Sequence, residues 1–472
     1  MDVPALLGTP RLVAGAVPPP FTIGPARDAA ELAAYRALRH ASFVAAQGRF
    51  AGSDHDEVDD DPRAVVLLAR EHAGTVLGGV RLAPCTDPEI GWWAGSRLVV
   101  ARGAPNRAGA ALVRAACSSA EAAGALRFDA CVQADKEPFF ARLGWERVRD
   151  VHRYGGPHVL MRWPIHRLRA QAASKAPIGE LVAALSPGGD GWVGDDGVPI
   201  PGSEIIAACD AIQPSMLERD PRWAGWCSVL VNANDLAAMG ATPVGLLDAL
   251  GAPTVSLAQR VVAGLRDAAE AYGVPVLGGH TQLGVPASLA VTMLGRTATP
   301  IPGGGGRPGD VVSVAADLRG RWRPGYAGRQ WDSTTSRSRD ELRRGVRTLQ
   351  HAPPAAAKDI SMAGLVGTLG MLAEASGTGA ELDLARVPRP DEATFADWLT
   401  CFPGLGFVTA DRVPLEVGDA PVTAATCGRL TTTPGVRLRW PDGEITDALT
   451  DPVTGLGPAT STTKETPHDA PA

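Results

Sequence analysis

The sequence has few cysteines for its length and no closely spaced pair of them. Seven cysteines are scattered over 472 residues, and none belongs to a C-x-x-C motif. An odd number without paired spacing argues against a disulfide framework and against a zinc site. The pattern is typical of a reducing compartment, so we expect a cytoplasmic protein.

Long apolar runs and an excess of positive charge are also missing. No apolar stretch approaches the ~20 residues that cross a bilayer, and the first residues lack the basic region and apolar core of a signal peptide. The formal net charge of -6 gives no indication of the positively charged surface that binds a nucleic acid. We therefore expect neither a membrane nor a nucleic acid as a partner.

Glycine and proline are abundant, with 55 and 40 residues, so turns are frequent. The length suits two or three domains, each with its own core. The stretch PIPGGGGRPGD (300–310) interrupts the second half of the chain, and its four consecutive glycines predict a hinge. The predicted parts are an irregular leader (1–20), an α/β domain (21–165), a helical or flexible linker (166–177), two α+β halves (178–300 and 301–450) and a disordered tail (451–472).

The first domain contains a helix whose entrance suits an anion. The strand SRLVVA leads through a turn into an Ala-rich helix from about Ala108 to Ala123. Small side chains at this entrance let backbone N–H groups approach a ligand, and the helix dipole favours a pyrophosphate. The candidate binding residues are Asn106, Arg107, Ala108, Gly109, Ala110 and Ala111.

Together with FFARLGWERV (139–148), this turn resembles the GNAT acyltransferase superfamily over about 140 residues. The resemblance implies a GNAT fold that binds acetyl-CoA or another acyl-CoA at Asn106 to Ala111. The upstream pattern, Arg36 and Arg39 before Phe43 and then GGVRLAP and EIGWWAGSRLVV, is similar to the acyl-homoserine-lactone synthase branch.

Two residues bear on acyl transfer in this domain. Glu89, just before the tryptophan pair, is a candidate general base, although a solvated carboxylate at a strand end would have the same surroundings in sequence. Phe140 stands where many GNAT proteins carry a tyrosine that protonates the leaving thiolate. A phenylalanine cannot act as a general acid.

The second half concentrates carboxylates within apolar segments. Asp195 and Asp196 lie in the turn GDDG, Asp210 ends an apolar strand, and Asn232 and Asp235 share one face of an apolar helix. Burying such groups is costly unless something compensates for their desolvation. Mg²⁺ prefers oxygen ligands and can bridge carboxylates to nucleotide phosphates, so the pattern predicts a Mg-ATP site.

Two further stretches belong to this pattern. VPVLGGHTQLG reads as a buried strand that opens into Gly279, His280 and Thr281. AAAKDISMAGLVGTLG places Lys358 and Asp359 before an apolar helix, with Ser361 as a candidate cap. Each polar residue also has a purely structural reading: Asp195 as a turn residue, Asp235 as the partner of a core arginine, or His280 as a core histidine.

The second half resembles the superfamily of aminoimidazole-ribonucleotide synthetase, thiamine-monophosphate kinase, selenophosphate synthetase and the nitrile-forming hydrogenase maturation protein. The matching segments are GDDGVPI, VNANDLAAMGATP and KDISMAGLVG. The resemblance implies two α+β halves that dimerise through a β-barrel. It also implies Mg-ATP ligands at Asp195, Asp196, Asp210, Asp235 and Asp359, nucleotide contacts at Asn232, Gly279 and Thr281, and catalytic roles for Lys358, His280 and Asp359.

This sequence departs from the named relatives at several positions. Ala363 replaces the second aspartate of the kinase motif D-[IL]-S-D-G-L, and His280 replaces the aspartate of its GGDT motif. The cysteine that selenophosphate synthetase carries before its GDD motif is missing, since no cysteine lies between Cys131 and Cys209. The resemblance is therefore to members fused to a GNAT domain whose reaction is not named.

These observations predict an α/β and α+β multidomain enzyme, a homodimer acting on a small-molecule substrate. The expected chemistry is ATP- and Mg²⁺-dependent phosphorylation of an oxygen on an amide, formyl or carboxylate group, beside an acyl-CoA-binding module. One alternative is a GNAT acyltransferase with the second half as a dimerising scaffold. Another is a nucleotide-sensing protein that binds ATP without consuming it.

Overall fold

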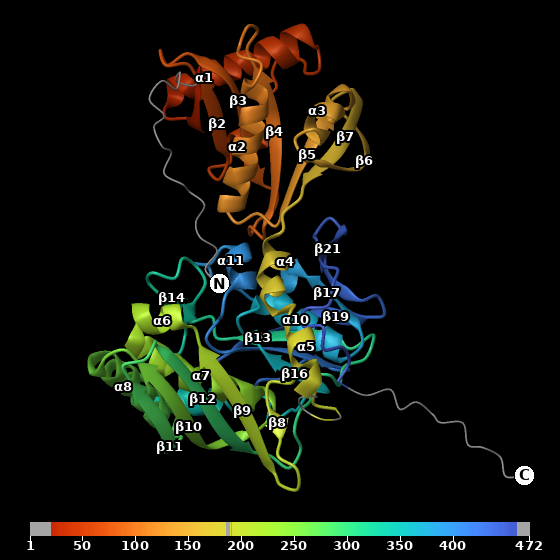
Figure 1. Cartoon of the computed structure of the whole chain (residues 1–472). Helices are drawn as coiled ribbons and strands as arrows, with labels where there is room; N and C mark the ends of the chain where they lie inside the picture. Colours follow the sequence, from red (N-terminus) through yellow and green to blue (C-terminus); the bar gives the residue numbers. More distant parts are fainter. Residues whose placement is uncertain (1–19, 186–188, 190, 460–472) are drawn as a thin grey trace, which may run out of the picture. The chain divides into compact units, whose positions relative to one another are not determined.

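The computed structural model describes residues 20–185, 189 and 191–459 (Figure 1). The predicted leader, apart from residue 20, and the tail beyond residue 459 lie outside these residues. The chain divides into two compact units, residues 1–165 and 166–472. Within the described residues, no helix combines the length and the apolar character that crossing a bilayer requires.

The first unit is built on a seven-stranded sheet in the order β1-β2-β3-β4-β5-β7-β6. Its helices are α1 (Ala29–Arg39), which continues into a π-helical segment, η1 (His40–Ala46), then α2 (Ala108–Ala122) and α3 (Glu137–Ala141), with short 3-10 turns η2 (Glu57–Asp59) and η3 (Ala134–Lys136). The strands are β1 (Thr22–Pro25), β2 (Val65–Arg70), β3 (Val76–Pro84), β4 (Trp92–Val100), β5 (Arg127–Gln133), β6 (Glu146–Arg153) and β7 (Gly156–Trp163).

Strands β4 and β5 pair only at their beginnings and then diverge. They are parallel partners from Trp92 with Arg127 to Gly95 with Ala130. Beyond this point β4 continues beside β3, and β5 continues beside β7. Arg97, just after the divergence, has a positive φ of 55° at an irregularity in the β3–β4 register. The sheet therefore opens between these two strands, and Figure 1 shows the opening between β4 and β5.

The second unit begins with residues predicted as a linker. Residues 166–177 are helical, the first of the two forms expected for this linker: they form α4 (Arg167–Ala172) and the turn η4 (Ala173–Lys175), followed by α5 (Ile178–Val182) and η5 (Ala183–Leu185). Leu168 and Ala172 are buried, and Arg167 forms an ion pair with Asp397. This segment is thus a packed part of the second unit, because its apolar face finds a partner there.

The N-terminal half of the second unit contains a five-stranded sheet in the order β11-β10-β12-β9-β8, on which α7 packs. Gly225 and Gly264 let α7 and α8 approach closely, since a Cβ on either would meet backbone of the other helix. The elements are β8 (Val198–Pro199), β9 (Ile205–Ile212), α6 (Pro214–Arg219), α7 (Pro221–Ala238), β10 (Thr242–Ala252), α8 (Val255–Tyr272), β11 (Val276–Leu283) and β12 (Ser288–Arg296).

Strand β11 does not have the buried environment that its apolar sequence predicts. It is the edge strand of this sheet, and all its residues are exposed. An apolar strand normally packs against other residues, but no segment of the described chain covers β11. The prediction of a strand buried within one chain is therefore wrong.

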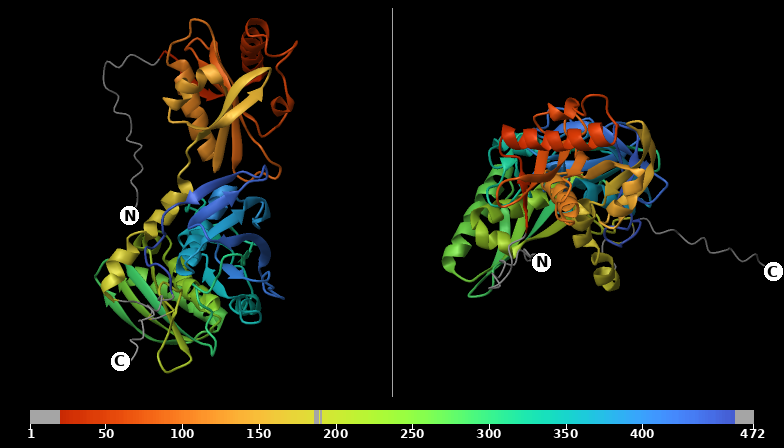
Figure 2. Two further views of the ribbon diagram at one scale, coloured as in Figure 1. Left: turned by 90° about the vertical axis from the view of Figure 1, so that its right-hand side faces the viewer. Right: turned by 90° about the horizontal axis from the view of Figure 1, so that it is seen from above.

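The C-terminal half contains a seven-stranded sheet in the order β16-β18-β13-β19-β17-β20-β21 and the buried helix α10. Both halves contribute to one hydrophobic core, and in Figure 2 they pack against each other, green against cyan and blue. The elements are β13 (Val311–Ala316), β14 (Arg321–Trp322), β15 (Trp331–Asp332), α9 (Arg339–Gly345), β16 (Ala356–Asp359), α10 (Gly364–Ala375), β17 (Gly379–Asp383), η6 (Leu384–Arg386), α11 (Phe395–Thr400), β18 (Gly406–Asp411), β19 (Thr423–Thr431), β20 (Gly435–Arg439) and β21 (Ile445–Leu449).

The glycine run at 303–306 is tightly packed and does not form the predicted hinge. A Cβ at Gly303 would lie 2.8 Å from Lys358 Nζ, and one at Gly305 would meet the carbonyl oxygen of Ala355. The run is therefore explained by close backbone approach, which only glycine permits, and it fastens the two halves together.

The described part of the predicted tail is also packed. The Glu374 carboxylate on α10 accepts hydrogen bonds from the backbone N–H groups of Val453 and Thr454, both at 2.9 Å. Val453 and Ala459 are buried. Residues 451–459 thus belong to the fold, because polar and apolar groups of α10 hold them, and here the prediction of disorder is wrong.

Candidate metal centre

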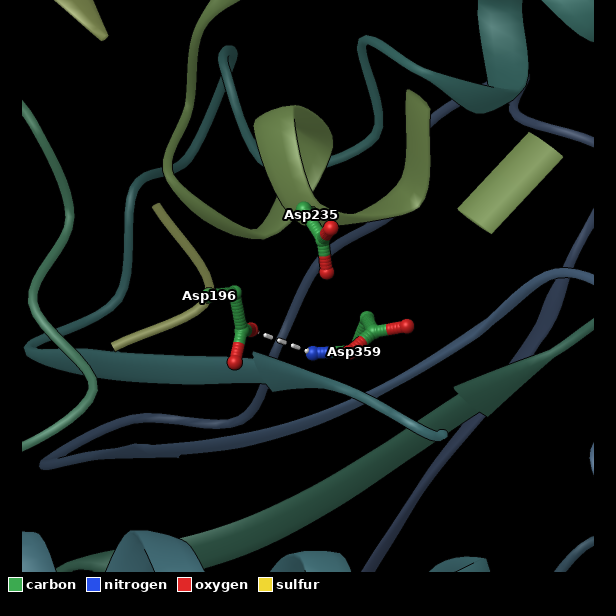
Figure 3. A group of neighbouring side chains, drawn as sticks. All are labelled: Asp196, Asp235 and Asp359. Carbon is green, nitrogen blue, oxygen red and sulfur yellow. Dashed lines mark hydrogen bonds between the residues drawn. The ribbon is translucent and has the colours of Figure 1, made fainter. Parts of the chain in front are cut away.

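Three aspartates from distant parts of the sequence meet in the second unit (Figure 3). Asp196, Asp235 and Asp359 each offer a carboxylate oxygen, and these oxygens all lie within 4.8 Å of one another. Asp235 and Asp359 are buried, and Asp196 is half-buried. Such proximity of like charges is the arrangement expected of a cation site.

Each carboxylate is placed by a different element. Asp196 lies in the turn before β8, Asp235 near the end of the buried helix α7, and Asp359 at the end of β16. The backbone N–H of Asp359 donates to Asp196 Oδ2 at 2.8 Å, so the turn is bonded directly to the strand. This bond brings the N-terminal motif GDDG to the C-terminal motif KDIS.

Lys358 is buried beside the same turn. Its ammonium group donates to the carbonyl oxygen of Gly194 at 2.7 Å and to Asp196 Oδ1 at 3.2 Å, and it lies 3.9 Å from Asp195 Oδ1. The backbone N–H of Gly303 donates to Asp195 Oδ2 at 3.0 Å. Lys358 therefore neutralises the turn from within, and Asp195 lies on the lysine side, outside the group of three.

The remaining predicted ligands adjoin the group. The carboxyl of Asp210, on β9, lies against that of Asp235. Asn232 precedes Asp235 by three residues on α7, and its Nδ2 donates to the carbonyl oxygen of Ser228 at 2.9 Å. Among the described residues, Asn232 Oδ1 and Asp195 Oδ1 are buried without a hydrogen-bond partner. Asn232 Oδ1 can thus accept a hydrogen bond from a further donor or bind a cation, whereas Asp195 Oδ1 has the Lys358 ammonium 3.9 Å away.

Burial and crowding shift the pKa values of these carboxyls upward. Burial, reinforced by Asp210 and Asp359, raises the pKa of Asp235 far above its usual range. Burial and the neighbouring Asp196 do the same for the pKa of Asp359. Burial raises the pKa of Asp195 to about 6. Without a cation, the ionised group is therefore unfavourable.

Lys358 responds in the opposite sense. Burial by itself would lower the pKa of its ammonium group, but the carboxylates of Asp196 and Asp195 outweigh burial and hold the pKa above its usual value. Lys358 thus stays charged, and its single positive charge faces several carboxylates. The excess negative charge and the all-oxygen donor set fit a hard divalent cation such as Mg²⁺, held by Asp196, Asp235 and Asp359 with Asp210 beside them.

The predicted residues of β11 lie elsewhere. Gly279, His280 and Thr281 are on the exposed edge strand, where Gly279 faces Asp248 of β10 in the register. Strands β10 and β12 separate them from β9, which carries Asp210. Within one chain the sheet order therefore keeps them away from the carboxylates.

The helix after KDIS begins later than its sequence predicts. Helix α10 starts at Gly364, and Ala363 at its N-cap position provides no side-chain hydrogen bond. Ser361 is therefore not the cap. The position of Gly303 beside Asp195 was not predicted, although the glycine run was the visible signal for a close backbone approach.

The candidate residues of the first unit are distributed over two places. Glu89 accepts hydrogen bonds from the backbone N–H of Gly91 and from Trp93 Nε1, so it stabilises the turn before β4. Arg107 is the N-cap of α2 and makes no capping bond with its side chain. Gly109 and Phe140 line a cavity of about 410 Å³ that Glu89 does not line.

The pKa shifts predict how Mg²⁺ binding depends on pH. Asp195, Asp235 and Asp359 contribute stability to the metal-free chain that is fully present below about pH 4 and is lost as the pH rises through their raised pKa values, about 6 for Asp195. For each of these groups, the free energy of unfolding falls by about 1.4 kcal/mol per pH unit between the pKa of the unfolded chain and that of the folded chain. Mg²⁺ binds ionised carboxylates, so its stabilising effect should increase with pH.

The measurement is the melting temperature with and without Mg²⁺. We expect a small Mg²⁺-induced rise at about pH 5 and a rise of several degrees at about pH 8. An equal rise at both pH values would contradict the assignment of these carboxylates to the cation.

Comparison with known proteins identifies both halves of the second unit. The family models of the AIR synthase related protein match residues 194–297 with the N-terminal domain and residues 335–440 with the C-terminal domain. The uncharacterized protein sll0787 of Synechocystis sp. is 35% identical over 259 residues, covering 52% of this chain and 78% of that protein.

More distant matches carry functional names. A thiamine-monophosphate kinase from Methanospirillum hungatei is 33% identical over 173 residues, covering 36% of this chain and 59% of that enzyme. The structure of T. maritima PurL complexed with AMPPCP aligns with a TM-score of 0.49 at 16% identity, covering 63% of this chain and 52% of that one. The predicted resemblance of the second half is confirmed, whereas the GNAT resemblance of residues 21–165 stays a prediction. The chain belongs to the AIR synthase-related protein family.

Proposed function

We propose that this protein is an ATP- and Mg²⁺-dependent enzyme that phosphorylates an oxygen of a small amide, formyl or carboxylate substrate. The observation that carries this proposal is the convergence of Asp196, Asp235 and Asp359 within 4.8 Å. Similarity to proteins named thiamine-monophosphate kinase supports a kinase or synthetase type of reaction.

The residues of the site have two roles: the aspartates would bind the cation, and Lys358 neutralises part of their charge. Asp196, Asp235 and Asp359 would hold Mg²⁺, and Asp210 would support Asp235. A Mg²⁺ ion held there would supply the positive charge that offsets negative charge on the transferred phosphoryl group. Lys358 keeps the GDDG turn in place through Gly194 and Asp196. Phosphorylation makes the substrate oxygen a leaving group, after which cyclisation or dehydration can follow.

We propose an acceptor other than thiamine monophosphate. Ala363, which stands where the kinase motif has its second aspartate, is buried at the start of α10 and offers no carboxylate. The space around it is filled by small groups, since a Cβ at Gly367 would lie 2.7 Å from the Ala363 Cβ. The chain therefore has a small apolar side chain at the position of that aspartate.

Replacing Asp235 by asparagine tests the proposed site. Asp235→Asn keeps the side-chain size but removes a buried ligand charge, so we expect the stabilisation by Mg-AMPPCP to disappear and ATP turnover to fall by at least ~100-fold. The measurements are melting temperature with Mg-AMPPCP and release of ADP. Asp267→Asn on α8, a half-buried residue that pairs with Arg222, is the matched control and should behave like wild type. Unchanged turnover in Asp235→Asn would refute the proposal.

The same experiment separates the enzyme from a nucleotide sensor. A sensor would gain stability from Mg-AMPPCP and would release no ADP with any small amide, formyl or carboxylate compound tested. Release of ADP that depends on such a compound identifies the substrate class and excludes the sensing alternative.

We also propose a homodimer formed through the open face of the five-stranded sheet. Val244, Leu247, Val276, Leu277 and Leu283 are apolar and exposed on β10 and β11. An exposed apolar edge strand is unfavourable in a monomer. A second copy covers such a face with the same residues by two-fold symmetry, and a dimer is what the family resemblance implies.

A charge placed on this face tests the dimer. Leu277 is 58% exposed, and Leu277→Arg is expected to convert the dimer to a monomer, because the interface would bury an unpaired charge. The molar mass is measured by light scattering after gel filtration at micromolar concentration. Val262→Arg on α8, where Val262 is 48% exposed, should remain dimeric. A monomeric wild-type protein would rule out this interface.

The first unit supports acyl-CoA binding as a second function. The cavity of about 410 Å³ lies where β4 and β5 diverge, and Gly109 at the start of α2 lines it. The N–H of Ala108 donates to the carbonyl oxygen of Pro105, but the next N–H groups at the start of α2 have no partner within the helix and suit a pyrophosphate. The apolar part of the lining, with Val113, Phe139 and Phe140, suits the uncharged arm of a coenzyme A ester.

Calorimetric titration with acetyl-CoA tests this second function. A large side chain at Gly109 would enter the cavity beside Val100 and Phe139, so Gly109→Leu is expected to weaken acetyl-CoA binding more than ~10-fold. Ala122→Leu, at the exposed opposite end of the same helix, is the control. Absence of binding in the wild-type protein would exclude an acyl-CoA module.

A further inference from the structure

The cavity of the first unit extends through the opening in the sheet to its other face. Along β5, Phe128, Ala130 and Val132 belong to the core, and the intervening Cys131 and Gln133 alternate to the opposite face. Residues of both sets line the cavity. A ligand bound on the α2 side can therefore be reached by a second molecule from the η1 side.

The lining on the η1 side is basic and contains no aspartate or glutamate among the described residues. Arg97 is neutralised by Asp54 and Asp56 and is stacked between two rings, 4.6 Å from Phe50 and 5.2 Å from Tyr154. Lys136 forms an ion pair with Asp135. Both cations thus already have a carboxylate partner.

Arg49 differs from these two cations. Its Nε donates to Gln47 Oε1 at 3.1 Å, and its Nη2 donates to Gln133 Oε1 at 3.3 Å. Both acceptors are neutral amides, and within the described part of the chain Arg49 forms no ion pair. A guanidinium held at a cavity wall by neutral groups is prepared to bind a carboxylate in a bidentate manner.

His158 lies next to Arg49 in this wall. It faces Gln133 across the β5–β7 pair, and it is 3% exposed. Its Nδ1 lies 3.0 Å from the carbonyl oxygen of Gly156, which can only accept, so Nδ1 carries the hydrogen and Nε2 has the free lone pair. A Cβ at Gly156 would lie 2.9 Å from Arg49 Nη1, so the guanidinium lies close to the same glycine.

We propose that this wall is the acceptor subsite of the acyltransferase and that it binds a small amine bearing a carboxylate, of the amino-acid class. Arg49 binds the carboxylate, and His158 Nε2 accepts the proton from the amine. The inference rests on the proposed acyl-CoA function. It adds the acceptor class and a general base that neither Glu89 nor Phe140 provides.

The reaction balances with these groups alone. The amine nitrogen attacks the thioester carbonyl carbon, a C–N bond forms, and the C–S bond breaks. His158 takes the proton released by the nitrogen and passes it to the departing thiolate, which gives an N-acylated product and a free thiol. One histidine thereby acts as both base and acid. The reaction then needs no second proton donor at the position of Phe140, which has no proton to give.

The test uses the full-length chain, acetyl-CoA, and paired acceptors: each common amino acid and its uncharged amide. We expect thiol release and an N-acetyl product with amino acids and much slower transfer to the amides. Arg49→Met should raise KM for the amino acid by about 10- to 100-fold with little change for the amide. Arg114→Met, an exposed arginine of α2 outside the cavity lining, is the matched control.

His158→Gln should lower kcat by ~100-fold or more with KM unchanged, and should remove the acidic limb of the pH–rate profile. The other titratable or charged groups among the described residues of the cavity lining are Arg49, Arg97, Cys131, Lys136 and Tyr154, and the Tyr154 ring lies 5.8 Å from the His158 ring. Since His158 is buried, a second measurement uses the wild-type protein: diethyl pyrocarbonate should label His158, and acetyl-CoA with an amino acid should protect it.

The outcomes distinguish this inference from the function on which it rests. If calorimetry detects no acetyl-CoA binding, the acyl-CoA function itself fails and the acceptor subsite fails with it. If acetyl-CoA binds but amides are acylated as fast as amino acids, the role of Arg49 is overturned. An unchanged pH–rate profile in His158→Gln, or no labelling of His158, overturns its role as the base.

Discussion

The hydrogen bond from the backbone N–H of Asp359 to Asp196 is the contact on which the second unit depends. It joins a turn of the N-terminal half to a strand of the C-terminal half, and with Asp235 of α7 the two aspartates form a group whose carboxylate oxygens lie within 4.8 Å. Repulsion among them opposes this arrangement, and burial strengthens the repulsion. The buried ammonium of Lys358 offsets part of it, and a divalent cation would offset the rest. With its carboxylates ionised, the site is therefore favourable only when positive charge is present.

Close backbone packing provides the rigidity that this arrangement requires. The glycine run at 303–306 fits where side chains would strike Lys358 or the backbone at Ala355, and Gly225 and Gly264 bring α7 and α8 together. Helix α7 in turn carries Asp235. Absence of side chains at a few positions therefore fixes the positions of charged side chains elsewhere, because a well-packed interior does not adjust continuously.

In the first unit, backbone geometry and ion pairs form a cavity. There the sheet is incomplete, since β4 and β5 separate after Gly95 and Ala130, and the opening leads from one face to the other. Aspartates elsewhere in the unit neutralise Arg97, while Arg49 keeps only amide partners. Among the described lining residues, the ion pairs therefore leave Arg49 with neutral partners, which is the basis of the carboxylate site proposed above.

The sequence by itself determined the local features: the apolar helix that carries Asn232 and Asp235, the turn with Asp195 and Asp196, and the Ala-rich helix that follows the strand SRLVVA. These follow from spacing along the chain, and the family resemblance named the same carboxylates. Tertiary structure decided which of them meet. It placed Asp195 on the lysine side, packed the glycine run that read as a hinge, and left β11 exposed at a sheet edge. Spacing specifies the face on which a side chain lies, whereas strand order and distant packing decide what that face meets.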